Sequence, residues 1–243
     1  MVELITKHNV KRVCFTGHSL GGGIANVAHL VVRAQLKKAG SPWHEPAGQV
    51  AKVTWLACTF ASLQPIVRKY VDPDKIPPLM AELDASSYNV VYGCDPVSRA
   101  PGMLKFLGDC VEVVAPKIGK ETVGTVAWLG IGVFLDGKLG SPLHGVDTAT
   151  HDVVKFLKNN GVTEVIGQFT HLGTVVYLAA EGLNPPKKGA EYVYLEGEDA
   201  IQKVLNVKGD DFLKLWGGVK GEDKYAEAFD KAHNAAYLRF VYK

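Results

Sequence analysis

Near its N-terminus the chain carries the run Val13-Cys14-Phe15-Thr16-Gly17-His18-Ser19-Leu20-Gly21-Gly22-Gly23. The apolar stretch from Val10 to Thr16 predicts a buried central strand before the glycines, and Ile24 to Leu36 predicts a helix after them. A Gly-x-Ser-x-Gly turn between a strand and a helix lifts the serine hydroxyl out of the sheet. Side chains at either glycine of this pattern are expected to clash. The run therefore predicts Ser19 as a nucleophile, the alternative being a serine in an ordinary glycine-rich turn.

The rest of the chain indicates the α/β class. Further strand-like segments alternate with helical ones, which predicts a mainly parallel sheet: Val50 to Thr59, Asn89 to Tyr92 and Gly173 to Leu178. Residues 100–167 fit no simple crossover, and they contain the apolar run Thr122 to Leu135 and a predicted helix from Thr148 to Lys158. We therefore expect one domain over residues 1–243, with an inserted helical cap at residues 100–167.

Composition narrows the classes of function. The chain has 243 residues, 47% of them hydrophobic and 21% charged, with a net charge of +2, as in a soluble globular protein. Scattered lysines and arginines argue against nucleic acid as a partner. The four cysteines match no zinc pattern and are expected to be buried thiols in a reducing, cytoplasmic compartment: Cys14, Cys58, Cys94 and Cys110.

A serine nucleophile needs an acid and a base. Asp95 directly follows the predicted strand that ends at Tyr92, and functional groups gather at the carboxyl ends of parallel strands. Asp72 and Asp74 are alternatives in a proline-rich turn, and Asp95 itself could serve only as a turn residue before Pro96. Asp95 is the favoured acid.

The base must be one of eight histidines. His18 lies inside the nucleophile turn, and His171 precedes its strand and so enters at the wrong end of the sheet. His233 comes after the last predicted parallel strand, although Tyr225 to Tyr242 could be one continuous helix with His233 on its surface. The other candidates lie in the expected cap: His144 and His151.

Three segments resemble the class 3 lipase family, alpha/beta-hydrolases that include fungal triacylglycerol lipases and diacylglycerol lipases. The nucleophile run is the first of them. Cys94-Asp95-Pro96-Val97-Ser98-Arg99-Ala100-Pro101 looks like the family's Asp-Pro-Val-Pro-x-x-Pro segment, and Phe169-Thr170-His171-Leu172-Gly173 is similar to its Phe-x-His-x-Gly strand. The segment from Ala232 to Leu238, which contains His233, looks like the segment that carries the family's terminal histidine. The resemblance implies an alpha/beta-hydrolase fold with the triad Ser19, Asp95 and His233.

The implied activity is that of a serine carboxylic ester hydrolase acting on acylglycerols through an acyl-enzyme, without metal or cofactor. The backbone N–H of Leu20 would be one oxyanion donor. The apolar cap segment around Trp128 and Phe134 could contact a lipid interface, which would place the protein at membranes or lipid droplets. Two alternatives stay open: a phospholipase A1 or soluble esterase, and a non-catalytic lipase remnant that depends on a partner.

Two departures from the family matter. The family has several strands before its nucleophile strand, one of whose loops supplies a second oxyanion donor, whereas about ten residues precede that strand here. We therefore expect a partial domain without those N-terminal strands. Its exposed edge strand would invite a second copy of the chain or a complementing N-terminal chain. In addition, the family's Phe-Gly-x-Pro-Arg strand end is replaced by Phe60-Ala61-Ser62-Leu63-Gln64-Pro65.

Overall fold

The computed structural model describes residues 1–41, 43, 49–67, 77–99, 169–179, 192–196, 204 and 222–241. The expected cap at residues 100–167 lies outside this part of the chain. So do the alternative acids and bases and one of the cysteines: Asp72, Asp74, His144, His151 and Cys110.

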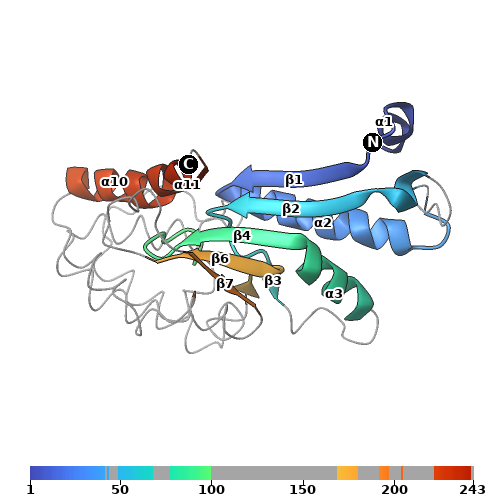
Figure 1. The fold of residues 1–243 in the computed structure, drawn as a ribbon. Helices are drawn as coiled ribbons and strands as arrows, with labels where there is room; N and C mark the ends of the chain where they lie inside the picture. The colour runs from blue at the N-terminus through green and yellow to red at the C-terminus, as the bar shows by residue number, and fades with distance from the viewer. Residues whose placement is uncertain are drawn as a thin grey trace, which may run out of the picture.

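A five-stranded sheet forms the centre of the described structure (Figure 1). Its strands, in spatial order, are β1 (Arg12–His18), β2 (Thr54–Phe60), β4 (Ser87–Tyr92), β6 (Thr174–Leu178) and β7 (Tyr192–Leu195). The first four are mutually parallel, and β7 pairs antiparallel to β6. A separate antiparallel pair joins β3 (Ile66–Val67) to β5 (Phe169–Thr170). The predicted α/β class with a mainly parallel sheet is confirmed.

Helices occupy two places around this sheet. The helices before β4 in the chain are α1 (Val2–Lys7), α2 (Leu20–Lys37), the 3-10 helix η1 (Gln49–Lys52) and α3 (Pro77–Ser86). Helix α2 packs against β1 and β2, and it also contacts α3. At the C-terminus a continuous helical run consists of α10 (Glu222–Asp230), the π-helical turn η4 (Lys231–Ala235) and α11 (Ala236–Val241). Figure 1 shows this run beside the arrowheads of the parallel strands. Among the described helices, none has the length and apolarity needed to cross a bilayer.

The central strands carry the core. Val90 and Val91 on β4 and all five residues of β6 are buried, as in strands at the centre of a sheet. A second cluster around Trp55 and Val32 joins β2 to α2. The start of the strand predicted from Val50 to Thr59 is wrong, since η1 occupies Gln49–Lys52 and β2 begins at Thr54.

Strand β1 corrects another expectation. Its apolar pattern predicts full burial, which is wrong, because its residues alternate between exposed and half-buried. The accompanying expectation of an exposed edge strand agrees with its position at the edge of the described sheet. Val13 and Phe15 pack into the cluster with α2, and the intervening Cys14 points away and is exposed. The prediction of buried thiols is therefore wrong for Cys14, whereas Cys94 is buried. Cys58 is half-buried, and burial, followed by the neighbouring Cys14, raises the pKa of its thiol.

Candidate active site

Ser19 stands at the junction of β1 and α2 in a strained backbone conformation. Its φ of 59° and ψ of −129° lie where residues other than glycine are seldom found. The turn is held from both sides: the Ser19 N–H donates to the carbonyl of Phe60 at 3.0 Å, and the Ser19 carbonyl accepts from Gly22 N–H at 3.0 Å. The side chain stays half-buried. This is the geometry that a strand-to-helix nucleophile turn requires.

The glycines of this turn do not share one role. A Cβ added at Gly17 would overlap the backbone carbonyl of Gly21, so Gly17 is required for the close approach of strand and helix. A Cβ at Gly22 would lie 2.9 Å from the Cβ of Ser62, on the loop after β2. A Cβ at Gly21 would meet nothing within 4 Å. The expectation that both glycines of Gly-x-Ser-x-Gly exclude side chains is therefore correct for Gly17 and wrong for Gly21.

Leu20 is the first helical residue of α2, with Ser19 as the N-cap. An N–H at this position has no carbonyl one turn earlier in the helix to bond, and it sits at the positive end of the helix dipole. Its position beside Ser19 is therefore suited to an anionic oxygen. That Leu20 serves as an oxyanion donor stays a prediction.

A buried polar network supports the helix that follows Ser19. Asn26 of α2 donates from its amide to Asn89 Oδ1 at 2.8 Å and to Ser62 Oγ at 3.2 Å. Thr59 Oγ1 donates to the same Asn89 oxygen at 2.7 Å. Because these side chains come from α2, β2, β4 and the loop after β2, their bonds fix the register between the elements that carry Ser19 and Asp95.

The loop after β2 departs from the resembled family in sequence, and it contains a residue in a left-handed backbone conformation. Ala61, where the family has glycine, adopts a φ of 50°, and its N–H donates to the Val90 carbonyl at 3.1 Å. A left-handed alanine is strained, so the surrounding contacts hold it in place. The turn that brings Ser62 against Gly22 therefore forms with alanine, and not glycine, at position 61.

Asp95 is fully buried just beyond the end of β4. Its Oδ1 accepts the Val97 N–H at 2.8 Å, and its Oδ2 accepts the Tyr237 hydroxyl at 2.6 Å. Nδ1 of His233 lies 3.1 and 3.2 Å from the two carboxylate oxygens. A buried carboxylate is tolerated only when donors surround it, and here three separate groups face it. The predicted acid and the predicted base are therefore in direct contact.

Tyr237 is a site residue that sequence reasoning missed. Its buried hydroxyl bonds Asp95 and also accepts the Tyr92 N–H at 2.9 Å, so it connects the end of β4 to α11. Burial first, and then the charge of Asp95, raise the pKa of Tyr237 well above its ordinary value, so the phenol remains a donor. The available signal was spacing: Tyr237 lies four residues after His233 and so shares a helix face with it.

His233 lies within η4, where the helical run widens into a π-turn, and it is 6% exposed. Two rings pack against its imidazole: the centroid of Phe229 lies 5.2 Å from that of His233, and the centroid of His18 lies 4.7 Å from it. Since Nδ1 faces Asp95, Nε2 is the ring nitrogen available to a substrate or nucleophile. The continuous-helix alternative is correct for the backbone, yet His233 is buried and not on the surface. Such π-turns occur often at functional sites.

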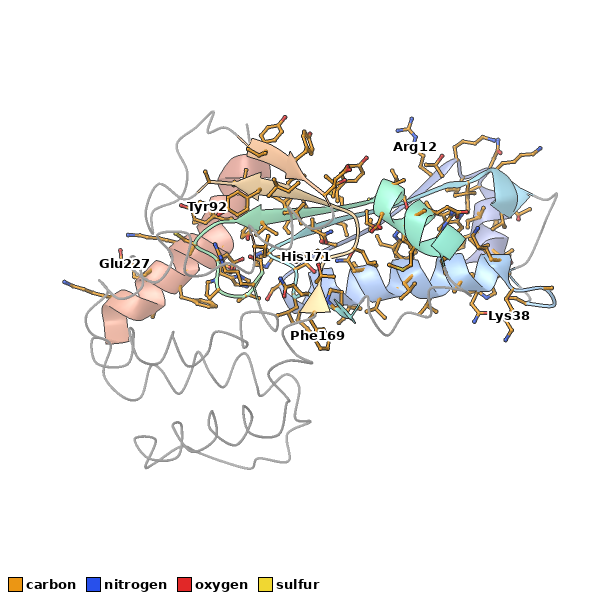
Figure 2. The ribbon with its side chains drawn as sticks, turned by 90° about the horizontal axis from the view of Figure 1, so that it is seen from below. Arg12, Lys38, Tyr92, Phe169, His171 and Glu227 are labelled. Carbon is orange, nitrogen blue, oxygen red and sulfur yellow. The ribbon has the colours of Figure 1, made fainter. Side chains whose placement is uncertain are left out.

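The link from this pair to the nucleophile turn runs through His18, the residue before Ser19. The Nε2 of His18 lies 2.8 Å from the carbonyl oxygen of His233. In Figure 2, Tyr92 at the end of β4 and Glu227 in α10 lie toward one end of the described structure, whereas Arg12 at the start of β1 and Lys38 lie toward the other. The carboxyl ends of β1 and β4 therefore meet the C-terminal helical run.

His171, set aside as a base, occupies a different position. It is buried, and its Nε2–H donates to the Ser98 carbonyl at 2.9 Å. Burial is the main cause that lowers the pKa of His171 to about 4, so its ring is neutral at ordinary pH. Its contacts join β6 to the turn that carries Asp95. Among the described residues, no cluster of three or more metal-ligating side chains occurs.

A comparison with models of protein families finds a match over the N-terminal part of the chain. Residues 1–105 match the family model described as lipase (class 3). The matched segment includes β1, β2, β4, Ser19 and Asp95, whereas His233 lies beyond it. A search of curated proteins gives no significant match.

Proposed function

Because residues 1–105 match the model of the class 3 lipase family, we propose that this protein is a serine carboxylic ester hydrolase that acts on acylglycerols. The family match supports a lipase-type ester hydrolase in general. One observation carries the more specific proposal: the base, His233, is buried against the fully buried Asp95, and its own carbonyl bonds the residue that precedes the strained Ser19.

In the proposed mechanism Ser19 Oγ attacks the ester carbonyl while Nε2 of His233 removes its proton. Asp95 holds the Nδ1–H tautomer and stabilises the imidazolium that forms. The Leu20 N–H donates to the developing oxyanion. His233 then protonates the departing alcohol, which leaves an acyl-Ser19. Water, deprotonated by His233, attacks that ester and releases the fatty acid, and His233 returns the proton to Ser19.

The non-catalytic alternative is less well supported by this arrangement. A strained backbone costs about 1–3 kcal/mol, and a buried carboxylate needs several donors placed around it. A lipid-binding remnant needs neither feature. Retention of both at one end of the sheet favours hydrolysis. A phospholipase A1 or soluble esterase would use the same groups, so the substrate distinguishes them.

We further propose that a second chain, either another copy or a complementing chain, covers β1 and α2. Strand β1 pairs with β2 on one side and is the last strand of the described sheet on the other. Four apolar side chains on one face of α2 are exposed: Leu20, Ile24, Val27 and Val31. An open edge beside an apolar helix face is characteristic of surfaces that associate. A cytoplasmic location, at membranes or lipid droplets, is part of the same proposal.

Covalent labelling tests the proposed function. The folded wild-type chain should react with a fluorescent fluorophosphonate and hydrolyse p-nitrophenyl esters. Ser19→Ala should abolish both, His233→Ala should slow both by at least about 10³-fold, and Ser41→Ala, outside the site, should change neither. Preference for long-chain acylglycerols at an interface over soluble short esters would support a lipase. A folded wild-type chain that neither labels nor turns over ester would contradict the proposal.

A further inference from the structure

His18 makes contacts with the base that the mechanism above does not use. Its Nε2 lies 2.8 Å from the carbonyl oxygen of His233, and its ring centroid is 4.7 Å from that of His233. Its ring also meets that of Tyr237 in an edge-to-face arrangement, with the centroids 5.7 Å apart. We propose that His18 is a positioning residue that holds the base against the nucleophile turn. This inference rests on the proposed function.

The geometry gives His18 a place no other described side chain has. It is the last residue of β1 and is bonded covalently to Ser19, while its ring bonds the peptide of His233. Asp95, by contrast, contacts the imidazole of His233. The ring of the base is therefore held from the end of β4, and its backbone is held from the end of β1. Together these contacts fix both the orientation of the imidazole and its distance from Ser19.

This contact matters because His233 lies in a π-turn. The residues of η4 follow a wider helical path than their neighbours in α10 and α11, so the position of His233 depends on contacts from outside the helix. Proton transfer from Ser19 requires hydrogen-bond distance, and a displacement of about 1 Å can cost about 10²-fold in rate. A tether at the carbonyl of the base opposes such displacement.

The hydrogen bond also specifies the chemistry of His18. A carbonyl oxygen only accepts, so Nε2 of His18 carries the proton and the neutral ring is the Nε2–H tautomer. His18 bonds His233 at its backbone and leaves both ring nitrogens of the base available for Asp95 and Ser19. Its effect is therefore on kcat and not on KM.

Three substitutions separate the effect of the hydrogen-bond donor of His18 from the effect of its ring. His18→Gln places an amide N–H at about the reach of Nε2, His18→Asn places one at the reach of Nδ1, and His18→Phe keeps the ring without a donor. We expect kcat for a p-nitrophenyl ester to fall about tenfold in the Asn and Phe variants, with KM unchanged. The Gln variant should stay within about twofold of wild type. Thermal unfolding of each variant identifies any that fail to fold.

The outcomes distinguish this inference from the proposed function. If wild type labels with fluorophosphonate but all three variants keep wild-type kcat, His18 has no positioning role. Equal losses in the Gln, Asn and Phe variants would also overturn it, because the donor would then be irrelevant. If wild type proves inactive, the proposed function fails, and the ring tautomer still tests the contact. Long-range ¹H–¹⁵N correlation should show His18 as the Nε2–H tautomer, and the Nδ1–H form would overturn the inference.

Discussion

A single carboxylate organises the residues of this site. Asp95 accepts hydrogen bonds from the Val97 backbone and the Tyr237 hydroxyl while facing Nδ1 of His233. Oδ1 accepts the N–H of Val97, which lies two residues later in the same turn, and Oδ2 accepts the Tyr237 hydroxyl. The carboxylate plane is therefore set before any charge appears on the imidazole. A base held in this way loses little energy to reorganisation when the imidazolium forms.

Replacing Tyr237 tests this arrangement at the residue scale. In Tyr237→Phe the carboxylate loses its shortest donor and the Tyr92 N–H loses its acceptor. We expect kcat to fall roughly tenfold and the free energy of unfolding to fall by about 1–3 kcal/mol. Ester kinetics and urea unfolding measure the two effects. Tyr194→Phe, the same change at a side chain that is 60% exposed, is the control and should behave as wild type. An unchanged kcat in Tyr237→Phe would show that Asp95 needs no such support.

At the scale of elements, the nucleophile turn depends on close contact between backbones. Gly17 on β1 approaches the Gly21 carbonyl on α2, and Gly22 approaches Ser62 on the loop after β2. The helix therefore packs against two strand ends at once. This packing keeps Ser19 in its strained conformation, because relaxing Ser19 would require α2 to move away from the sheet.

Two matched substitutions distinguish the glycines. Gly17→Ala should lower the free energy of unfolding by about 2 kcal/mol or more, since the new methyl group overlaps backbone atoms that cannot rotate aside. Gly21→Ala should be neutral or stabilising by about 0.5–1 kcal/mol, because it adds a helix-favouring residue in open space. Urea unfolding of both variants checks the pair. Destabilisation by Gly21→Ala equal to that by Gly17→Ala would contradict the proposed difference.

For the whole molecule, the strand order explains why distant segments meet. The parallel strands β1, β2, β4 and β6 lie side by side in chain order, so their carboxyl ends share one edge of the sheet. The C-terminal helical run lies at that edge (Figure 1). The same order leaves β1 at the boundary of the described sheet, next to the exposed apolar face of α2.

A charge placed on that face tests the proposed association. If a second copy covers it, the weight-average mass of the wild-type chain should rise with concentration toward twice the monomer mass in sedimentation equilibrium. Ile24→Glu should shift the dimer dissociation constant upward by about tenfold or more, because the carboxylate would be desolvated in the interface. Lys38→Glu, on an exposed residue outside the apolar face, should leave the dissociation constant unchanged. A wild-type chain that stays monomeric at every concentration would rule out the second copy.

The sequence alone determined the local features of this protein. Strand-like segments that alternate with helical ones indicated the α/β class, and the nucleophile turn was recognisable because strand, turn and helix are contiguous in the chain. Asp95 was predictable for a similar reason, since it directly follows an apolar strand. His233 was weighed against other histidines, because 138 residues separate it from Asp95 and no local rule spans that distance.

Only the tertiary structure decided the contacts between segments. Tyr237 reaches Asp95, and His18 reaches His233, because the strand order and the C-terminal run bring β1, β4 and α11 to one edge of the sheet. Burial of β1 was mispredicted because an apolar pattern reports how a strand could pack, whereas its neighbours decide whether it does. Gly21 likewise differs from Gly17 through the atoms around it, although the motif treats the two glycines alike. Spacing along the chain predicts helices, strands and turns, whereas the contacts between distant segments are decided only when the chain folds.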